Sequence, residues 1–176
     1  GREVVPEGVR GLKALSRRFT FAVDFKEARA AGLRLAIATT TTPENVTVLL
    51  EHSLGTGTPD WFEVIAAGDI VPAKKPAPDI YHYALQEMGL NAADCLAFED
   101  SENGLRASLG AGLKTLVTIN DYTRDHDFTG AAVVLSDLGD PGAPNQRIAG
   151  PDLGQPFVDL AYLRALHAAQ GLGFRG

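Results

Sequence analysis

Short apolar runs alternate with helical patterns along most of this chain. From Leu33 onward, an apolar run is followed by a polar or glycine-rich break, and then by apolar residues at helical spacing. Runs of this length, bounded by breaks, predict strands. The strands are expected at 35–38, 62–67, 95–98, 113–117 and 131–135. The helices are expected to begin near Pro43, Asp79, Ser101 and Asp159.

This alternation predicts the fold class. Strands that alternate with helices of about ten residues are typical of βαβ units and a parallel sheet. Parallel strands covered on both faces read as continuous apolar runs, as these do. We therefore predict an α/β fold, a Rossmann-like doubly wound parallel sheet with helices on both faces. Ligands of such sheets bind at the carboxyl ends of the strands.

Composition narrows the classes of function. The chain has 176 residues, 45% of them hydrophobic and 22% charged, with a net charge of −6. An acidic chain without a basic run does not favour nucleic-acid binding. No apolar run approaches the roughly 20 residues that span a bilayer, so no membrane association is expected. The single cysteine, Cys95, has no internal disulfide partner, which suits the reducing cytoplasm.

Adjacent carboxylates follow the third predicted strand. Glu99 and Asp100 come directly after the run Cys95 to Phe98. Two such groups suit a hard cation such as Mg²⁺, which prefers oxygen ligands. Acidic residues are also favoured at the first turn of a helix, so plain helix capping is an alternative interpretation.

A lysine and two threonines are the other candidate site residues. Lys75 lies between Pro72 and Pro76, in a loop stiff enough to hold an ammonium near developing negative charge. Thr39 ends the first predicted strand, and its hydroxyl and the N–H groups after it, beginning at Thr40, suit phosphate oxygens at a helix N-terminus. The alternatives are a surface lysine and capping of the helix at Pro43.

The order of these residues resembles a known family. Thr39, then Lys75 within Lys-Pro-Ala-Pro-Asp, then Glu-Asp-Ser-x-x-Gly from Glu99 to Gly104, is similar to motifs two, three and four of the haloacid dehalogenase superfamily. Within it, the chain resembles the CbbY-type branch, near the β-phosphoglucomutases and phosphoglycolate phosphatases. The segments that carry this closer resemblance are 37–46, 69–76 and 120–123.

The resemblance implies a mechanism and roles for these residues. Members of the family transfer the phosphoryl group to a motif-one aspartate. By resemblance, Asp100 would ligate Mg²⁺ with help from Glu99, Lys75 would neutralise phosphoryl charge, and Thr39 would bind a phosphoryl oxygen. Thr40 would also contact the substrate. The implied substrate is a small sugar phosphate, xylulose-1,5-bisphosphate in the CbbY-type branch, and the implied location is cytoplasmic.

Motif one, Asp-x-Asp-Gly followed by Thr or Val, does not occur in the sequence. We interpret residues 1–26 as a remnant of the linker from cap to core plus an atypical segment, and residues 27–176 as the core domain. Phe19 to Phe25 reads as a strand that ends in an acid. If it stood for the motif-one strand, Ala22 would take the place of the nucleophile and Asp24 would follow; an altered connection between helix and strand is the favoured interpretation.

The favoured function is therefore a magnesium-dependent phosphatase core whose nucleophile is not among these residues. Three alternatives stay open. In the first, the chain is a catalytically inactive binding or scaffold protein, or a truncated fragment. In the second, it is a phosphosugar mutase similar to β-phosphoglucomutase. In the third, it is a receiver-like or nucleotide-binding α/β domain. The last would need an acidic cluster after the first strand or a glycine-rich phosphate loop.

Overall fold

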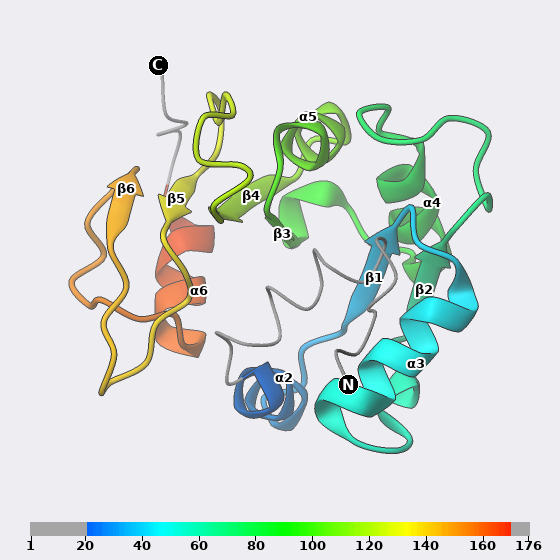
Figure 1. The fold of residues 1–176 in the computed structure, drawn as a ribbon, viewed down its shortest axis with the longest axis horizontal. Helices are drawn as coiled ribbons and strands as arrows, with labels where there is room; N and C mark the ends of the chain where they lie inside the picture. The colour runs from blue at the N-terminus through cyan, green and yellow to red at the C-terminus, as the bar shows by residue number, and fades with distance from the viewer. Residues whose placement is uncertain (1–20, 170–176) are drawn as a thin grey trace, which may run out of the picture.

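The computed structural model describes residues 21–169, with side chains from residue 25. Thirteen elements follow one another along this part of the chain (Figure 1). They are α2 (Phe21–Ala30), β1 (Ala36–Thr39), α3 (Pro43–Leu54), η2 (Thr58–Trp61), β2 (Val64–Ala67), α4 (Asp79–Met88), η3 (Ala92–Asp94), β3 (Leu96–Glu99), α5 (Glu102–Gly110), β4 (Lys114–Thr118), β5 (Val133–Leu135), β6 (Arg147–Ala149) and α6 (Leu160–Ala168).

The strands form two sheets. β1 pairs in parallel with β2, and a second sheet has the order β3-β4-β5-β6. β3, β4 and β5 are parallel to one another, whereas β6 pairs antiparallel with β5. The predicted α/β class and the five parallel strands are confirmed. The division into two sheets and the short strand β6 were not predicted.

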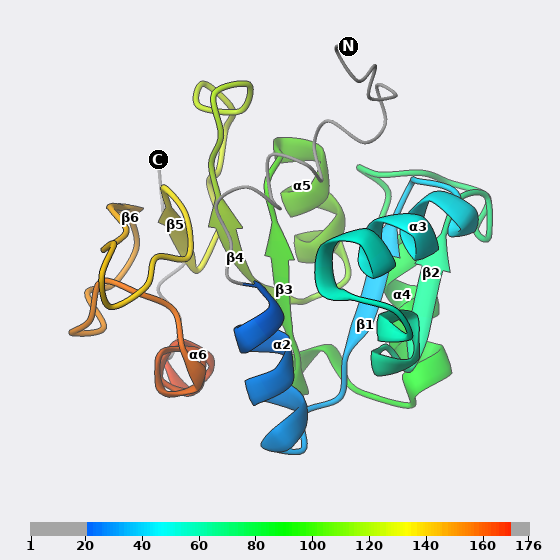
Figure 2. The same ribbon diagram turned by 60° about the horizontal axis from the view of Figure 1, so that its bottom comes forward.

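Helices cover both faces, as expected. Leu116 and Val117 are neighbours on β4 and therefore point to opposite faces. Leu116 packs with α6 in one buried cluster, and Val117 packs with α5 in another. Around β1 and β2 the same alternation places α3 on one face and α4 on the other. α2 contacts α3 and α6, so these three helices share a face, opposite α4 and α5 (Figure 2).

The start of α3 shows how local sequence fixes an element. Pro43 occupies the first helical position, where a missing N–H costs nothing. The Thr42 side chain accepts a hydrogen bond from the backbone N–H of Asn45 at 3.5 Å and caps the helix. Val46 and Leu50, one helical turn apart, are buried. The helix expected near Pro43 is thus confirmed, and the loop that precedes it stays close to the end of β1.

The prediction of a strand over Phe19 to Phe25 is wrong for residues 21–25, which the structure describes. Phe21 begins helix α2, and residues 19 and 20 lie outside the described residues. The alternating apolar residues suggested a strand, but Phe25 and Ala28 are also three apart, which places both on one helical face. Phe25 packs edge-on against Phe62 and Ala28 is buried. The comparison of Ala22 and Asp24 with a motif-one strand therefore fails.

The domain division at residue 26 stays a prediction, because α2 runs across it and residues 1–20 lie outside the described part of the chain. None of the helices described between residues 21 and 169 has the length and apolar character needed to cross a membrane.

Candidate active site at the carboxyl ends of β1 and β3

The Lys75 ammonium links the carboxyl ends of the two sheets. Lys75 lies in the loop between β2 and α4, and its Nζ donates a hydrogen bond to the backbone oxygen of Ala38 on β1 at 3.0 Å. The same Nζ is 2.6 Å from Oε1 of Glu99, the last residue of β3. Both side chains are largely buried, with 14% of Lys75 and 7% of Glu99 exposed. A charge pair this deep is held far more rigidly than a surface pair.

Tyr81 is a second partner of Glu99. From the first turn of α4, its hydroxyl donates a hydrogen bond to Glu99 Oε1. The Lys75 Nζ lies 5.0 Å from the centroid of the Tyr81 ring, which adds a cation–π contact. Burial, and then the negative charges of Glu99 and Asp100, raise the pKa of Tyr81, so the hydroxyl keeps its proton and stays a donor. Tyr81 therefore holds both members of the ion pair.

In the sequence, Tyr81 shares a helical spacing with Ala84, Leu85 and Met88, which indicates burial but no role in the site. A signal for more was present, because a buried tyrosine hydroxyl needs a polar partner. The sequence does not show which partner the fold supplies, since Glu99 is 18 residues away in the chain.

Gly104 makes room for the Glu99 carboxylate. A β-carbon at Gly104 would lie 1.8 Å from Glu99 Oε2 and 2.3 Å from Glu99 Cδ. Ser101 caps α5 by accepting a hydrogen bond from the Gly104 N–H at 3.2 Å, which fixes the first turn of the helix beside β3. The run Glu-Asp-Ser-x-x-Gly thus has a steric explanation in this structure: its glycine leaves the space that its glutamate fills.

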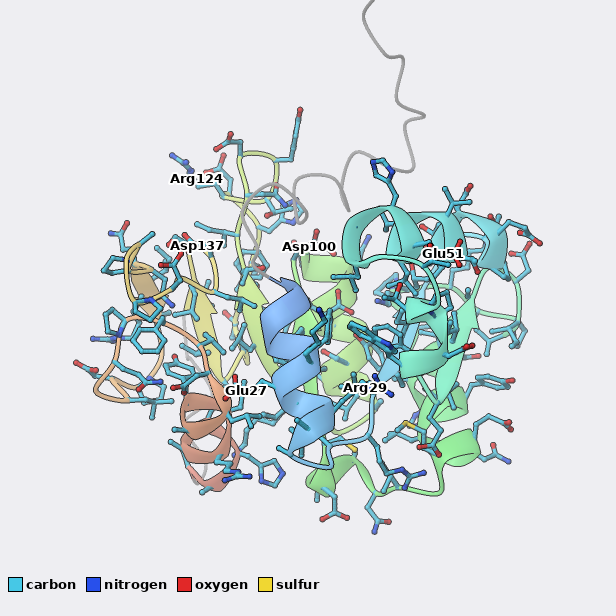
Figure 3. The ribbon with its side chains drawn as sticks, turned by 90° about the horizontal axis from the view of Figure 1, so that it is seen from below. Glu27, Arg29, Glu51, Asp100, Arg124 and Asp137 are labelled. Atoms are coloured by element: carbon cyan, nitrogen blue, oxygen red, sulfur yellow. The ribbon has the colours of Figure 1, made fainter. Side chains whose placement is uncertain are left out.

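Asp100 is the member of the acidic pair whose side chain stays open to a ligand from outside the described residues. Its side chain makes no hydrogen bond to any other residue in the described part of the chain. Burial raises the pKa of Asp100, against the opposing charges of Lys75 and His126. His126 lies close by, where its Nδ1 accepts a hydrogen bond from the backbone N–H of Glu102 at 3.3 Å. Figure 3 labels Asp100 on the same side of the molecule as the loop that carries Arg124.

This arrangement fits a hard cation bound by few protein ligands. Mg²⁺ commonly uses one or two carboxylates and completes its coordination with water and phosphate oxygens. Asp100 offers a desolvated carboxylate that no other described side chain hydrogen-bonds, whereas Oε1 of Glu99 is already shared by Lys75 and Tyr81. Residues 21–169 contain no group of three or more acidic, histidine or cysteine side chains that could hold a metal by themselves.

The two threonines lie at the same edge of the sheet. Thr39 directly follows Ala38, whose carbonyl binds Lys75, and its Oγ1 accepts a hydrogen bond from the Thr41 N–H at 3.2 Å. Thr40 is exposed at the surface. The structure therefore brings Thr39, Lys75, Glu99 and Asp100 to one edge, as the order of the motifs led us to expect. The roles of these residues in binding and catalysis stay predictions.

Comparison with known proteins gives a family for this arrangement. A family model described as haloacid dehalogenase-like hydrolase matches residues 25–112, which is half of the chain. The matched range contains all of the candidate site residues.

Curated relatives point in the same direction. The chain is 48% identical over 144 residues to the plasmid-encoded protein CbbY of Cupriavidus necator, a match that covers 80% of this chain and 55% of the relative. It is 54% identical over 111 residues to CbbY of Rhodobacter capsulatus, covering 63% of this chain and 49% of that protein. The chain therefore spans about half the length of the curated relatives it matches.

Solved structures agree with the fold. CbbY from Rhodobacter sphaeroides in complex with phosphate superposes with a TM-score of 0.66 at 47% identity, covering 68% of this chain and 53% of that one. A point mutant of the same protein in complex with xylulose-(1,5)bisphosphate gives a TM-score of 0.67 at 43% identity, covering 73% of this chain and 61% of that one.

Proposed function

Because the chain belongs to the haloacid dehalogenase-like hydrolases, we propose that it forms the core of a magnesium-dependent phosphatase for a small sugar phosphate. One observation carries the proposal: the Lys75 ammonium joins the ends of β1 and β3, next to the unpartnered Asp100 carboxylate. A cation and a carboxylate at the carboxyl ends of parallel strands form a site suited to a phosphoryl group and its metal ion.

Each residue has a distinct role in the proposal. Asp100 holds the metal ion, with Glu99 supporting it through its free oxygen. Magnesium, when bound, supplies charge neutralisation at the phosphoryl oxygens. Lys75 places a fixed positive charge beside the same group, and Tyr81 keeps that ammonium and Glu99 in position. The Thr39 hydroxyl and the N–H groups near Thr40 bind a phosphoryl oxygen at the start of α3.

Xylulose-1,5-bisphosphate is the substrate to test first. The support is the similarity to the CbbY mutant whose structure contains this compound. The matched region covers only part of that protein, so the choice of sugar rests on likeness in the shared core. A cytoplasmic location, consistent with the free Cys95, belongs to the same proposal.

The nucleophile is not assigned to any residue of this chain, because the sequence lacks the Asp-x-Asp-Gly motif. The proposed binding of phosphate groups is therefore distinct from their hydrolysis. Lys75 and Asp100 should give magnesium-dependent binding of phosphate groups, whereas hydrolysis through an aspartyl-phosphate requires a nucleophile supplied from elsewhere.

Calorimetric titration with xylulose-1,5-bisphosphate, with and without Mg²⁺, tests the proposal, and a colorimetric phosphate assay of the same mixtures tests turnover. We expect binding that requires Mg²⁺ and is lost in Asp100→Asn, without release of phosphate. Absence of magnesium-dependent binding would contradict the proposed site. Sustained phosphate release that depends on Asp100 would show that a nucleophile does lie within the chain.

A further inference from the structure

A cleft lies at the end of the second sheet that is farther from the candidate active site. It has a volume of about 350 Å³ and is lined by the end of β5, the start of β6, the 152–156 loop and α6. Figure 1 shows β5, β6 and α6 together at one side of the molecule. The sheet order places β4 between β5 and β3, so the cleft is separate from the site around Lys75 and Asp100.

Tyr162 is the buried polar side chain of this cleft. Only 3% of the residue is exposed, and it packs with Leu135 and Leu138 in the cluster beneath α6. Its backbone N–H donates to Asp159, but its hydroxyl makes no hydrogen bond to any residue between 21 and 169. No buried polar side-chain atom in this part of the chain is both sealed from solvent and without a partner. The Tyr162 oxygen therefore opens into the cleft that the residue lines.

The Tyr162 hydroxyl offers a proton to the cleft. Burial raises the pKa of Tyr162, against the opposing charge of Arg147, so the proton stays on the oxygen at neutral pH. A buried tyrosine hydroxyl usually has a hydrogen-bond partner, because an unmet donor costs free energy. The described residues supply none, so the cleft has a place for an acceptor atom brought by a ligand.

Arg147 and Asp152 give the cleft one positive and one negative charge. One guanidinium nitrogen of Arg147 donates to the backbone oxygen of Gly150 at 2.7 Å, and another lies 3.9 Å from Oδ2 of Asp152. A β-carbon at Gly150 would lie 2.9 Å from Cα of Val133, so glycine lets this turn pack against β5. The Arg147 guanidinium is therefore held by a fixed turn, and the two charges of the described lining cancel.

Gln155 adds an acceptor to the lining. Its amide nitrogen donates to the backbone oxygen of Phe157 at 3.2 Å and to Oδ1 of Asp159 at 2.5 Å. Both of its N–H groups are therefore used, and Oε1 accepts no hydrogen bond from residues 21–169. The oxygen of Gln155 is thus available to a donor on a ligand.

We propose that this cleft binds a small uncharged ligand with several hydroxyl groups, of the size of a monosaccharide. Pockets for small ligands begin at about 300 Å³, so a volume of about 350 Å³ suits a ligand of this size. A hydroxyl group both donates and accepts, and can therefore pair with Tyr162 and Gln155 alike. An anion would face Asp152, a cation would face Arg147, and an apolar molecule would leave the polar groups unpaired. The inference does not depend on the proposed function.

Two-dimensional ¹H–¹⁵N NMR of the full chain, without Mg²⁺, tests the cleft. The probes are D-xylose, a neutral pentose, and, in a separate titration, inorganic phosphate. We expect D-xylose to shift amide signals between residues 145 and 155, with a dissociation constant in the millimolar range, while segments 36–39 and 96–100 stay unchanged. Phosphate should leave the signals between residues 145 and 155 unchanged.

Two pairs of variants provide the controls. Tyr162→Phe removes only the hydroxyl and should weaken D-xylose binding at least about fivefold, whereas Tyr83→Phe, on α4, should leave it within about twofold. Arg147→Met should also weaken binding at least about fivefold, whereas Arg164→Met, at an exposed position on α6, should leave it within about twofold. If one variant fails to fold, the other pair still decides. The proposal is overturned if D-xylose leaves the signals between residues 145 and 155 unchanged, if phosphate shifts them more strongly, or if Tyr162→Phe binds D-xylose as tightly as the parent.

Discussion

Strands β4 and β5 are buried more completely than β1 and β3, although all four are short. Leu116, Val117 and Val133 are fully buried, whereas β1 is partly exposed along its length and Phe98 of β3 is 46% exposed. Within residues 21–169, β4 has a strand on each side, whereas β1 and β3 have one each. Burial of a strand in this protein is therefore set by its neighbours in the sheet more than by its own composition.

The buried polar groups also differ between the region around β4 and the end of β3. Near β4, the hydroxyls of Ser108 and Thr115 are fully buried and lie 2.7 Å apart, so they share a hydrogen bond, and backbone oxygens of Leu105 and Leu113 provide further acceptors. At the end of β3, Asp100 is desolvated without such a partner, and burial raises its pKa. The candidate site residues thus lie where the sheet is interrupted, between β1 and β3. This contrast makes the region around β4 and β5 the scaffold and the ends of β1 and β3 the site.

Truncating one side chain in each region should give the largest difference in the free energy of unfolding. Leu116→Ala removes a fully buried side chain and should lower the free energy of unfolding by about 3 kcal/mol. Phe98→Ala should cost less than about 1 kcal/mol, because much of that side chain is already exposed. Urea unfolding followed by circular dichroism measures both. Equal losses would break the comparison between the two regions.

Gly104→Ala should disturb the site from the helix side. The new methyl group overlaps the Glu99 carboxylate, which must leave Lys75 and Tyr81 to make room. We expect a loss of about 2 kcal/mol in stability, measured by urea unfolding. In a Glu99→Ala background the same substitution should cost much less, because the obstructing carboxylate is gone. An equal cost in both backgrounds would assign the effect to α5 alone.

Tyr81→Phe should have a smaller effect that is confined to the Glu99 hydrogen bond. It removes one donor to a buried carboxylate and should cost about 1 to 2 kcal/mol. Tyr83→Phe, on the same helix and only partly buried, is the matched control and should change stability by less than about 0.5 kcal/mol. Thermal unfolding compares the two variants. Identical melting temperatures would show that the Tyr81 hydroxyl contributes nothing to the site.

Asp100→Asn should have the smallest effect on stability, and it should stabilise the chain rather than destabilise it. Because the folded-state pKa of Asp100 is raised, the folded chain binds more protons than the unfolded chain between the two pKa values. The Asp100 carboxyl therefore lowers stability as pH rises from about 4 through its folded pKa. The variant should be more stable than the parent near pH 7, by less than about 1 kcal/mol, and this gain should shrink toward pH 4. Melting curves across this range, without Mg²⁺, measure it; a variant less stable near pH 7 would contradict the account.

Much of this fold was predictable from local patterns. The five parallel strands and the capped helix at Pro43 have signals within a few residues, namely an apolar run, a capping threonine and a proline. Residues Phe21 to Phe25 were predicted wrongly because their alternation and their helical spacing compete, and packing of Phe25 against Phe62 is a tertiary contact. β6 was missed because it has only three residues and pairs across a loop.

For the site, the residues were predictable but most of the contacts were not. The order of Thr39, Lys75 and Glu99-Asp100 after strand ends indicated one edge of the sheet, and the structure places them there. The sequence suggested that Glu99 assists Asp100 at the metal ion. In the structure Glu99 instead binds Lys75 and Tyr81, and the Asp100 carboxylate hydrogen-bonds no other residue between 21 and 169. Such a division depends on side-chain direction across 18 to 24 residues of chain, which no local pattern encodes.

The central claim is that Lys75 and the acidic pair form one site for a phosphate group and a metal ion. A titration with inorganic phosphate in the presence of Mg²⁺, followed by ³¹P NMR, tests it most directly in the parent chain, Lys75→Met and Lys74→Met. Lys74 is the matched neighbour, since it is exposed and pairs with Asp69 at 2.8 Å. We predict that phosphate affinity falls at least tenfold for Lys75→Met and stays within about twofold for Lys74→Met, a difference of at least about 1 kcal/mol. Equal affinities in the two variants would contradict the account.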